Sequence, residues 1–291
     1  MKLYSPKTIN EIKDLFGFRF SKSLGQNFLT DQNIIDKIVD GSDIDEDDLV
    51  IEIGPGIGVI TAACAQRAEK VVAIEIDKNL LPVLQYTLGE YGNVEVVNND
   101  VLKTDINGII EEKGFKSAKI IGNLPYYITT PIIMHLLENH VNAESITVMM
   151  QKEVADRIKS APGKKTYGAI SVAVQYYCTV ETVTDVSKEV FMPKPKVDST
   201  VLRLDLRKEP PVQLKDRDVF FGCIKKGFGQ RRKTLLNSMT GFRGMDKDAI
   251  RECLEESGIE PSRRAETLSI EEFAELANKI CEKEVVYGQD N

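Results

Sequence analysis

The chain has 291 residues, of which 42% are hydrophobic and 29% charged, and its formal net charge at pH 7 is −7. This composition is typical of a folded, soluble protein, and the length predicts one main domain and a smaller second one. The first residues, "MKLYSPKTINEIKDLF", lack the apolar stretch of a signal peptide, and no later run reads as a membrane span. We therefore expect a cytoplasmic protein without a membrane segment.

The cysteines and histidines of the chain limit the kinds of metal site, disulfide and catalytic base that it can form. The five cysteines are scattered and form no CxxC pair, and the only histidines are His135 and His140. This pattern argues against a disulfide framework, a zinc site and a multi-histidine metal centre, so we expect no metal. It also disfavours a reaction that needs a histidine base.

From residue 49 onward, short apolar runs alternate with amphipathic stretches of helical length. The predicted strands are 49–54, 71–77, 94–100, 118–123 and 145–151. The predicted helices between them are 57–68, 78–89, 104–113 and 129–139. Strands that alternate with helices predict an α/β fold with a parallel, doubly wound, Rossmann-like sheet.

The pattern changes after the fifth strand. We expect a helix at 167–177, then two β-rich runs at 179–186 and 199–206 that close the sheet as a hairpin. A charged linker with two prolines follows, and beyond it the predicted elements are all helices: about 216–228, 231–239, 246–257 and 269–282. The predicted domains are therefore 1–208, a catalytic domain with its N-terminal segment, and 212–291, a smaller all-helical domain.

Three predicted strands end in residues suited to an adenosine ligand, at the sheet edge where such folds bind ligands. The first runs into "EIGPGIG", whose glycines, beginning with Gly54, allow a tight turn before a helix N-terminus. The second ends in Glu75, placed to accept hydrogen bonds from ribose hydroxyls, and the third in Asp100, placed to accept from an adenine amino group. Each acid alone is equally consistent with a helix N-cap. The three together predict an adenosine-containing cofactor.

The form of the glycine turn bears on which cofactor this is. A nicotinamide site usually has the pattern GxGxxG, whereas this turn is "GPGIG" and Glu52 precedes its first glycine by two residues. An acid there suits a ligand with an ammonium and a sulfonium better than a diphosphate. We therefore expect S-adenosyl-L-methionine rather than NAD.

The fourth strand ends in "NLPY". The side-chain carbonyl of Asn123 and the backbone carbonyl of Leu124 are suited to accept the two N–H bonds of an adenine amine, directing its lone pair at a sulfonium methyl. Tyr126 offers a face on which a flipped base can stack. Such a transfer relies on positioning and electrostatics and needs no strong base.

Several motifs occur in a fixed order: "GQNFL", "EIGPGIG", "IEID", "NNDV", "GNLPYYITTP", "QKEVADRI" and "FMPKPKVDS". Over about residues 20–280 the chain resembles the KsgA (RsmA) family of ribosomal RNA adenine N6,N6-dimethyltransferases. The resemblance implies dimethylation of two adjacent adenosines near the 3′ end of 16S rRNA in the small ribosomal subunit, during ribosome biogenesis.

The resemblance also implies site residues. The cofactor contacts it implies are Asn27, Leu29, Gly54, Glu75, Asp100 and Asn123. Asn27 and Leu29 are implied by the resemblance alone, since "LGQNFLTD" otherwise reads as a loop before a helix capped by Asp31. Phe191 is implied as a second aromatic wall for the target base, although it also suits a hydrophobic plug before a proline turn.

The helical domain carries the expected RNA contacts. Residues 219–245 contain six Lys or Arg and no acid, in an otherwise acidic protein. We expect phosphate contacts from Lys225, Lys226, Arg231, Arg232 and Lys233, with Phe228 either stacking or packing. Lys164 and Lys165 add to this surface on a weaker argument, and Arg263 and Arg264 are expected to pair with nearby acids.

Other functions stay open on the residues alone. A large-subunit rRNA methyltransferase of the antibiotic-resistance type shares the catalytic core, but "LGQNFL", the double tyrosine and the long helical tail favour the small-subunit enzyme. A DNA adenine methyltransferase is disfavoured because no separate base-reading domain is evident. The chain could also serve mainly as an assembly factor that occupies the immature subunit, because binding and catalysis would use the same surfaces. A nicotinamide oxidoreductase is the remotest alternative. The absence of a coiled-coil or dimer stripe favours a monomer.

Overall fold

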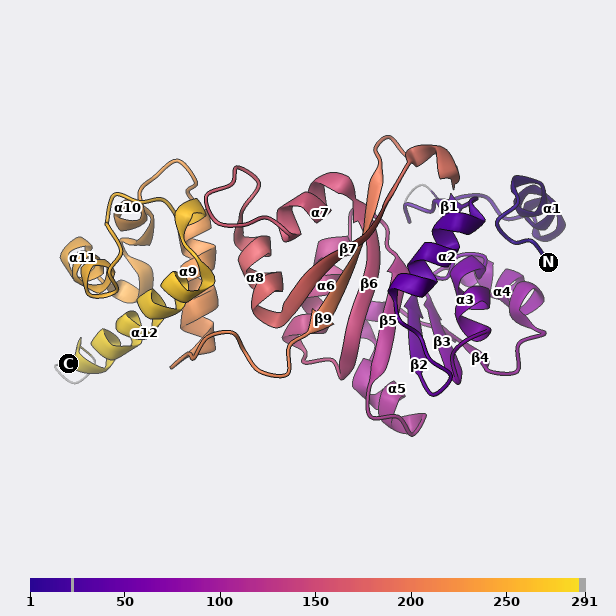
Figure 1. The fold of residues 1–291 in the computed structure, drawn as a ribbon, viewed down its shortest axis with the longest axis horizontal. Helices are drawn as coiled ribbons and strands as arrows, with labels where there is room; N and C mark the ends of the chain where they lie inside the picture. Colours follow the sequence, from indigo (N-terminus) through magenta and orange to yellow (C-terminus); the bar gives the residue numbers. More distant parts are fainter. Residues whose placement is uncertain (22–23, 288–291) are drawn as a thin grey trace. The chain divides into compact units, whose positions relative to one another are not determined.

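The computed structural model describes residues 1–21 and 24–287 (Figure 1). The chain forms two compact units. The first contains Met1–Ala155 and Thr179–Leu206, and the second contains Asp156–Cys178 and the residues from Arg207 onward.

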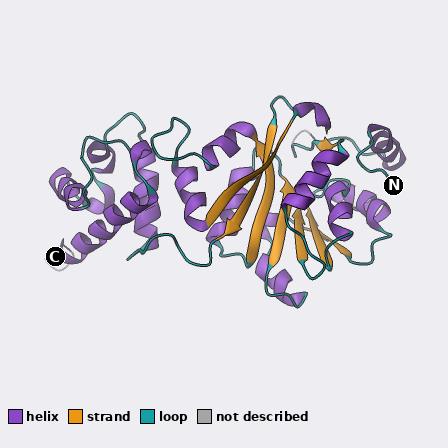
Figure 2. Cartoon of the chain, viewed as in Figure 1, coloured by secondary structure: helices purple, strands orange, loops and turns teal. Residues whose placement is uncertain are grey.

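The first unit is built on strands flanked by helices (Figure 2). Its strands are β1 (Phe28–Leu29), β2 (Leu49–Ile53), β3 (Lys70–Glu75), β4 (Val94–Asn98), β5 (Ala118–Asn123), β6 (Ala143–Gln151), β7 (Cys178–Val186), β8 (Phe191–Met192) and β9 (Ser199–Leu206). Its helices are α1 (Pro6–Phe16), α2 (Gln32–Gly41), α3 (Val59–Ala65), α4 (Leu81–Leu88), α5 (Ile106–Glu112), α6 (Thr129–Glu138) and the start of α7 (Lys152–Ile158).

The main sheet has seven strands in the order β4-β3-β2-β5-β6-β9-β7. Neighbouring strands from β4 to β6 are parallel, and β9 runs antiparallel to β6. The chain moves outward from β2 to β3 and β4 on one side, then returns to continue with β5 and β6 on the other. The carboxyl ends of β2 and β5 therefore flank the topological switch point, where open α/β sheets bind ligands.

The core of this unit holds the strands in place for the site. Ile35, Ile38 and Val39 recur at helical spacing along α2 and are buried together with Val50 of β2 and Ile121 of β5. Burying an aliphatic side chain of this size stabilises the fold by about 1.5–3 kcal/mol. Asp31 begins α2 as predicted, because its carboxylate accepts the Asn33 N–H at 2.8 Å.

The second unit is helical. It contains the end of α7 and α8 (Ala169–Tyr177), α9 (Arg217–Phe228), α10 (Leu235–Met239), α11 (Lys247–Glu256) and α12 (Ile270–Tyr287). Its core gathers Phe220, Phe273 and other apolar side chains of these helices around Tyr167 and Tyr176.

The predicted fold class is confirmed, with a parallel five-strand core, a closing pair β7–β9 and a helical C-terminal part. Several boundaries differ by two or more residues. The third predicted strand ends at Asn98 because Asp100 instead begins a short 3-10 turn. The helix expected at 167–177 begins at Ala169, and the one expected at 231–239 begins only at Leu235. The helices α1 and α7 were not predicted.

The compact units differ from the predicted domains in one respect. The break after Leu206 lies close to the predicted linker, but Asp156–Cys178 belongs to the helical unit rather than to the sheet. The physical reason is packing: Tyr167 and Tyr176 are buried in the helical core, where Tyr167 meets the Phe228 ring at 5.9 Å. Strand and helix patterns along the chain do not reveal that residues 156–178 pack with the C-terminal helices rather than with the sheet.

Candidate active site

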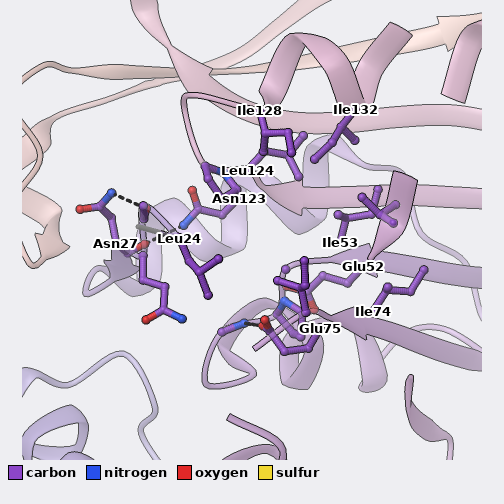
Figure 3. Close-up of a pocket in the computed structure, with 18 of the residues that line it drawn as sticks. Leu24, Asn27, Glu52, Ile53, Ile74, Glu75, Asn123, Leu124, Ile128 and Ile132 are labelled. Atoms are coloured by element: carbon purple, nitrogen blue, oxygen red, sulfur yellow. Dashed lines mark hydrogen bonds between the residues drawn. The ribbon is translucent and has the colours of Figure 1, made fainter. Parts of the chain in front are cut away.

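A pocket opens at the switch point of the sheet, within the first unit (Figure 3). Its walls are the turns that follow β2, β3, β4 and β5, together with the N-terminal segment before and within β1. The predicted residues that line it are Asn27, Leu29, Gly54, Glu75, Asp100, Asn123, Leu124 and Tyr126. The structure therefore brings together all the predicted cofactor residues and three of the four predicted catalytic ones.

The three glycines after β2 have different neighbours. All three have positive φ, at 72° for Gly54, 61° for Gly56 and 86° for Gly58. A Cβ on Gly56 would lie 2.7 Å from the Phe28 ring and one on Gly58 would lie 2.9 Å from Leu88, so these two glycines allow close packing. A Cβ on Gly54 would meet nothing within 4 Å. Gly54 is therefore the glycine that leaves space for a ligand.

Glu75 lies at the end of β3 and is 4% exposed. Its carboxylate accepts the Asp77 N–H at 2.8 Å and the Gly56 N–H at 3.3 Å, which ties the second strand end to the glycine turn. Burial raises the pKa of Glu75, and these two backbone donors act in the opposite direction. The next residue, Ile76, is 51% exposed at the pocket wall and offers it an apolar surface that the sequence argument missed.

Glu52 lies in the pocket floor, and in the sequence it was interpreted as an acid that suits a ligand with an ammonium and a sulfonium. It is 1% exposed, and the Thr61 hydroxyl donates a short hydrogen bond to its carboxylate. Burial raises the pKa of Glu52 to about 8, with a further contribution from the nearby Glu75 carboxylate. Burial therefore favours the protonated form of this carboxyl over the carboxylate.

Asp100 follows β4 and combines both roles considered for it. Its carboxylate accepts the Leu102 N–H at 3.1 Å, which caps a 3-10 turn, and the residue also lines the pocket. The cap engages one carboxylate oxygen, and the other lies 4.0 Å from Nζ of the exposed Lys103.

The N-terminal segment is held against the strand ends by two side-chain amides. Asn123 donates from Nδ2 to the Asn27 carbonyl at 2.9 Å, and Gln26 donates to the Asp77 carboxylate at 2.9 Å. The Asn27 side chain in turn donates to the Gly25 carbonyl at 2.9 Å (Figure 3). Gln26 was not predicted, and nothing in its sequence context signals this contact.

The turn after β5 is fixed by local hydrogen bonds. The Pro125 carbonyl accepts the Ile128 N–H and the Thr129 hydroxyl, both at 3.0 Å. The Tyr126 hydroxyl shares a 2.7 Å hydrogen bond with the buried Ser199 hydroxyl of β9. This holds the Tyr126 ring in place beside Asn123.

Phe191 does not line this pocket. It is 5% exposed, pairs with Leu29 across the two-stranded β1–β8 sheet, and packs in the core with α2. Phe191 is therefore a buried side chain that packs in the same cluster as Leu29 and supports the N-terminal segment, in agreement with the structural alternative considered for it. A second aromatic wall at Phe191 remains a prediction that this geometry does not support.

The predicted basic residues lie on the second unit, around the end of α9. Lys225, Arg231, Arg232 and Lys233 are exposed, and Lys226 is half-buried. Arg231 donates to the Lys165 carbonyl at 2.9 Å, so the loop that carries Lys164 and Lys165 adjoins this surface within the same unit.

Two further residues of this unit have structural contacts. The sequence left open whether the Phe228 ring stacks on RNA or packs within the protein, and in the structure it packs against Tyr167 and Phe273. Arg263 pairs with Glu272 as predicted.

Two features are absent from the residues that the structure describes. No group of three or more potential metal ligands occurs among them. No helix within residues 1–21 and 24–287 is long and apolar enough to cross a membrane.

The sequence matches the family described as "Ribosomal RNA adenine dimethylase" over residues 17–282. It is 53% identical to the ribosomal RNA small subunit methyltransferase A of Alkaliphilus oremlandii, over 97% of this chain and 99% of that protein. The protein of the same name from Clostridioides difficile is 52% identical, over 97% of this chain and 98% of the relative.

Two solved structures resemble this chain over most of its length. A dimethyladenosine transferase from Plasmodium falciparum superposes with a TM-score of 0.76 at 25% identity, covering 88% of this chain and 98% of that one. The 23S rRNA methyltransferase ErmE gives a TM-score of 0.67 at 26% identity, covering 87% and 99%. Since the family match and the curated relatives span nearly its whole length, this chain belongs to the ribosomal RNA adenine dimethylase family.

Proposed function

We propose that this protein dimethylates the N6 amines of two adjacent adenosines near the 3′ end of 16S rRNA in the small ribosomal subunit, using S-adenosyl-L-methionine. The observation that carries the proposal is Asn123, which stands at the carboxyl end of β5 with its amide N–H₂ anchored on Asn27. The names of the curated relatives, ribosomal RNA small subunit methyltransferase A, support the choice of subunit.

The pocket residues fit this cofactor. Glu75 has acceptor capacity for ribose hydroxyls, because its two observed hydrogen bonds use only part of the lone pairs of a carboxylate. Ile76 offers an apolar face to the adenine, and Asp100 an acceptor for its amino group. Gly54 leaves open space that would admit the methionine portion, and Glu52 lines the same pocket.

When bound, S-adenosyl-L-methionine supplies a methyl group made electrophilic by its sulfonium. The residues of the chain orient the acceptor. Because the Asn123 N–H₂ group is held by Asn27, its side-chain oxygen is left to accept one amine N–H, and the Leu124 carbonyl accepts the other. This arrangement favours a tetrahedral nitrogen whose lone pair points at the methyl carbon. Held by Asn123 and Leu124, the amine nitrogen would take the methyl group that the cofactor supplies, the cofactor sulfur would leave with the electron pair of its methyl bond, and the nitrogen would release a proton to water.

Tyr126 holds the target base. Its ring is fixed by the hydrogen bond between its hydroxyl and Ser199, so stacking requires little loss of side-chain freedom on binding. Base–aromatic stacking contributes about 1–3 kcal/mol per base.

The helical unit binds the RNA backbone. Arg232, Lys233 and Lys225 are exposed, and Lys225 and Lys226 occupy the last turn of α9. Their charge attracts phosphates in a salt-dependent manner despite the negative total charge, because the local distribution decides where RNA docks. We further infer a cytoplasmic, monomeric enzyme that acts during ribosome biogenesis.

The test is methyl transfer from labelled cofactor to small ribosomal subunits that lack the modification, with mass analysis of the digested nucleosides. We expect dimethyladenosine in 16S rRNA, and its loss in Asn123→Ala. In a parallel reaction with large ribosomal subunits, label in 23S rRNA together with none in 16S rRNA would assign the resistance-type activity instead. Cofactor binding without any transfer would leave subunit assembly as the main function.

A further inference from the structure

The chain places a second tyrosine beside the one proposed to hold the target base. Tyr126 and Tyr127 occupy the middle of the turn closed by the hydrogen bond between the Ile128 N–H and the Pro125 carbonyl. Both line the pocket. Whereas Tyr126 is half-buried and bonded to Ser199, Tyr127 is 60% exposed.

Tyr127 is unusual among the exposed apolar side chains of the described residues. The large ones are Met1, Leu15, Ile76, Tyr86, Tyr127 and Val197, and only Ile76 and Tyr127 of these line the pocket. The proposed cofactor accounts for Ile76 and leaves Tyr127 uncovered. A tyrosine ring contributes a large apolar area when it is covered, so an exposed ring at a pocket rim is suited to stack on a ligand that binds there.

Gly25 lies near one edge of the Tyr127 ring. A Cβ built on Gly25 would lie 3.6 Å from Cε1 and 3.7 Å from Cδ1 of Tyr127. Gly25 has a φ of 59°, and its carbonyl is bonded to Asn27. The ring therefore lies near Gly25, with room for about a methyl group between them, while most of it is exposed to a binding partner.

A flipped base leaves its neighbours in the strand without a stacking partner. The proposed position of the target base, between Asn123 and Tyr126, puts the adjoining nucleotide at the mouth of the pocket. We propose that Tyr127 stacks on the nucleobase next to the target adenosine, so that the two consecutive tyrosines hold two consecutive bases. This inference rests on the proposed function and assigns Tyr127 to RNA binding rather than to cofactor binding.

The experiment compares Tyr127→Ala and Tyr127→Phe with the wild type on small ribosomal subunits that lack the modification. Loss of one base stack predicts that kcat/KM for the subunit falls about 5- to 150-fold in Tyr127→Ala. Tyr127→Phe keeps the ring and stays within about twofold of the wild type. Affinity for S-adenosyl-L-methionine, measured by calorimetry without RNA, is unchanged in both variants.

Tyr86→Ala is the matched control, because Tyr86 is 51% exposed and lies outside the pocket, against Phe16. It should retain wild-type kcat/KM. Wild-type kcat/KM in Tyr127→Ala would overturn the inference and leave the proposed function standing. An equal loss in cofactor affinity would also overturn it, by making Tyr127 a support of the cofactor pocket. Absence of methylation by the wild type would instead overturn the proposed function.

Discussion

The Asn123 side-chain amide donates a 2.9 Å hydrogen bond to the backbone carbonyl of Asn27, 96 residues earlier in the chain. This bond joins the end of β5 to the N-terminal segment across the pocket. It also decides the orientation of the amide, because the nitrogen is engaged and the oxygen is left for the substrate. A residue suited to methyl transfer is thus positioned by a segment that precedes the sheet in sequence.

Asn123→Ala removes both the substrate acceptor and the donor to Asn27. We expect the rate of methyl transfer in a single turnover to fall by at least about 10²–10³-fold, as when one preorganised hydrogen-bonding group is removed from an active site. Cofactor affinity should fall less, because the Asn27 carbonyl loses one partner at a cost of about 1–3 kcal/mol. Rapid-quench kinetics and calorimetry measure the two effects separately.

Asn123→Asp separates the two roles of the side chain. It keeps the size and the acceptor but cannot donate to Asn27, and its carboxylate faces a carbonyl oxygen. We expect it to lose activity as severely as Asn123→Ala. Activity near the wild type in Asn123→Asp would show that the bond to Asn27 does not orient the catalytic oxygen.

Much of the site was predictable because it lies at the ends of strands that the apolar pattern reveals. Gly54, Glu75 and Asp100 each follow such a run, and parallel strands bring their carboxyl ends to one edge. The packing role of Gly56 was not predictable, because it depends on Phe28, which approaches from a different part of the chain.

Contacts between distant segments explain the remaining differences. Phe191 pairs with Leu29, which lies more than a hundred positions earlier in the chain. Tyr167 is buried against Phe228, about sixty positions later. The hydrogen bonds of the N-terminal segment also join residues that are far apart in the sequence. Periodicity reports the local environment of a residue and carries no information on which distant segment covers it. Only the resemblance to a known family pointed to Asn27 and Leu29.

The glycine turn provides a test that distinguishes packing from ligand access. Gly54→Ala introduces a methyl group into open space at a φ of 72°, so we expect a stability loss of about 1–2 kcal/mol and a clear loss of cofactor affinity. Gly56→Ala carries a similar backbone cost and also places its Cβ 2.7 Å from the Phe28 ring, so it should unfold at a lower temperature than Gly54→Ala. Thermal unfolding with and without cofactor compares them. The reverse order of melting temperatures would contradict this assignment.

The basic surface of the helical unit predicts a change in salt dependence. Arg232→Ala combined with Lys233→Ala removes two exposed charges and should reduce the slope of log K against log salt for RNA binding by about 1.4–1.8. Lys37→Ala combined with Lys116→Ala removes two exposed lysines of the first unit and serves as the control. Equal slopes for the two double variants would mean that the 231–233 segment contacts no phosphate. Filter binding over a salt series provides the measurement.

Glu52 predicts how stability depends on pH in the protein without cofactor. Its pKa in the folded state is about 8, against 4.5 for the free side chain, because burial disfavours the carboxylate. Below pH 4.5 the carboxyl is protonated in both states and costs nothing. As the pH rises toward 8 the unfolded chain ionises while the folded protein keeps the proton, so folding becomes less favourable by about 1.4 kcal/mol per pH unit, and the effect levels off above 8.

Glu52→Gln removes this titration and retains an oxygen that can accept from Thr61. The free energy of unfolding of Glu52→Gln relative to the wild type should therefore rise by about 2–3 kcal/mol between pH 5 and pH 7. Glu46→Gln, which alters an exposed acid, should show no such trend. Urea unfolding at several pH values measures the difference. Parallel pH curves for Glu52→Gln and the wild type would mean that Glu52 is already ionised in the folded protein, and that the pocket floor carries a negative charge before any cofactor binds.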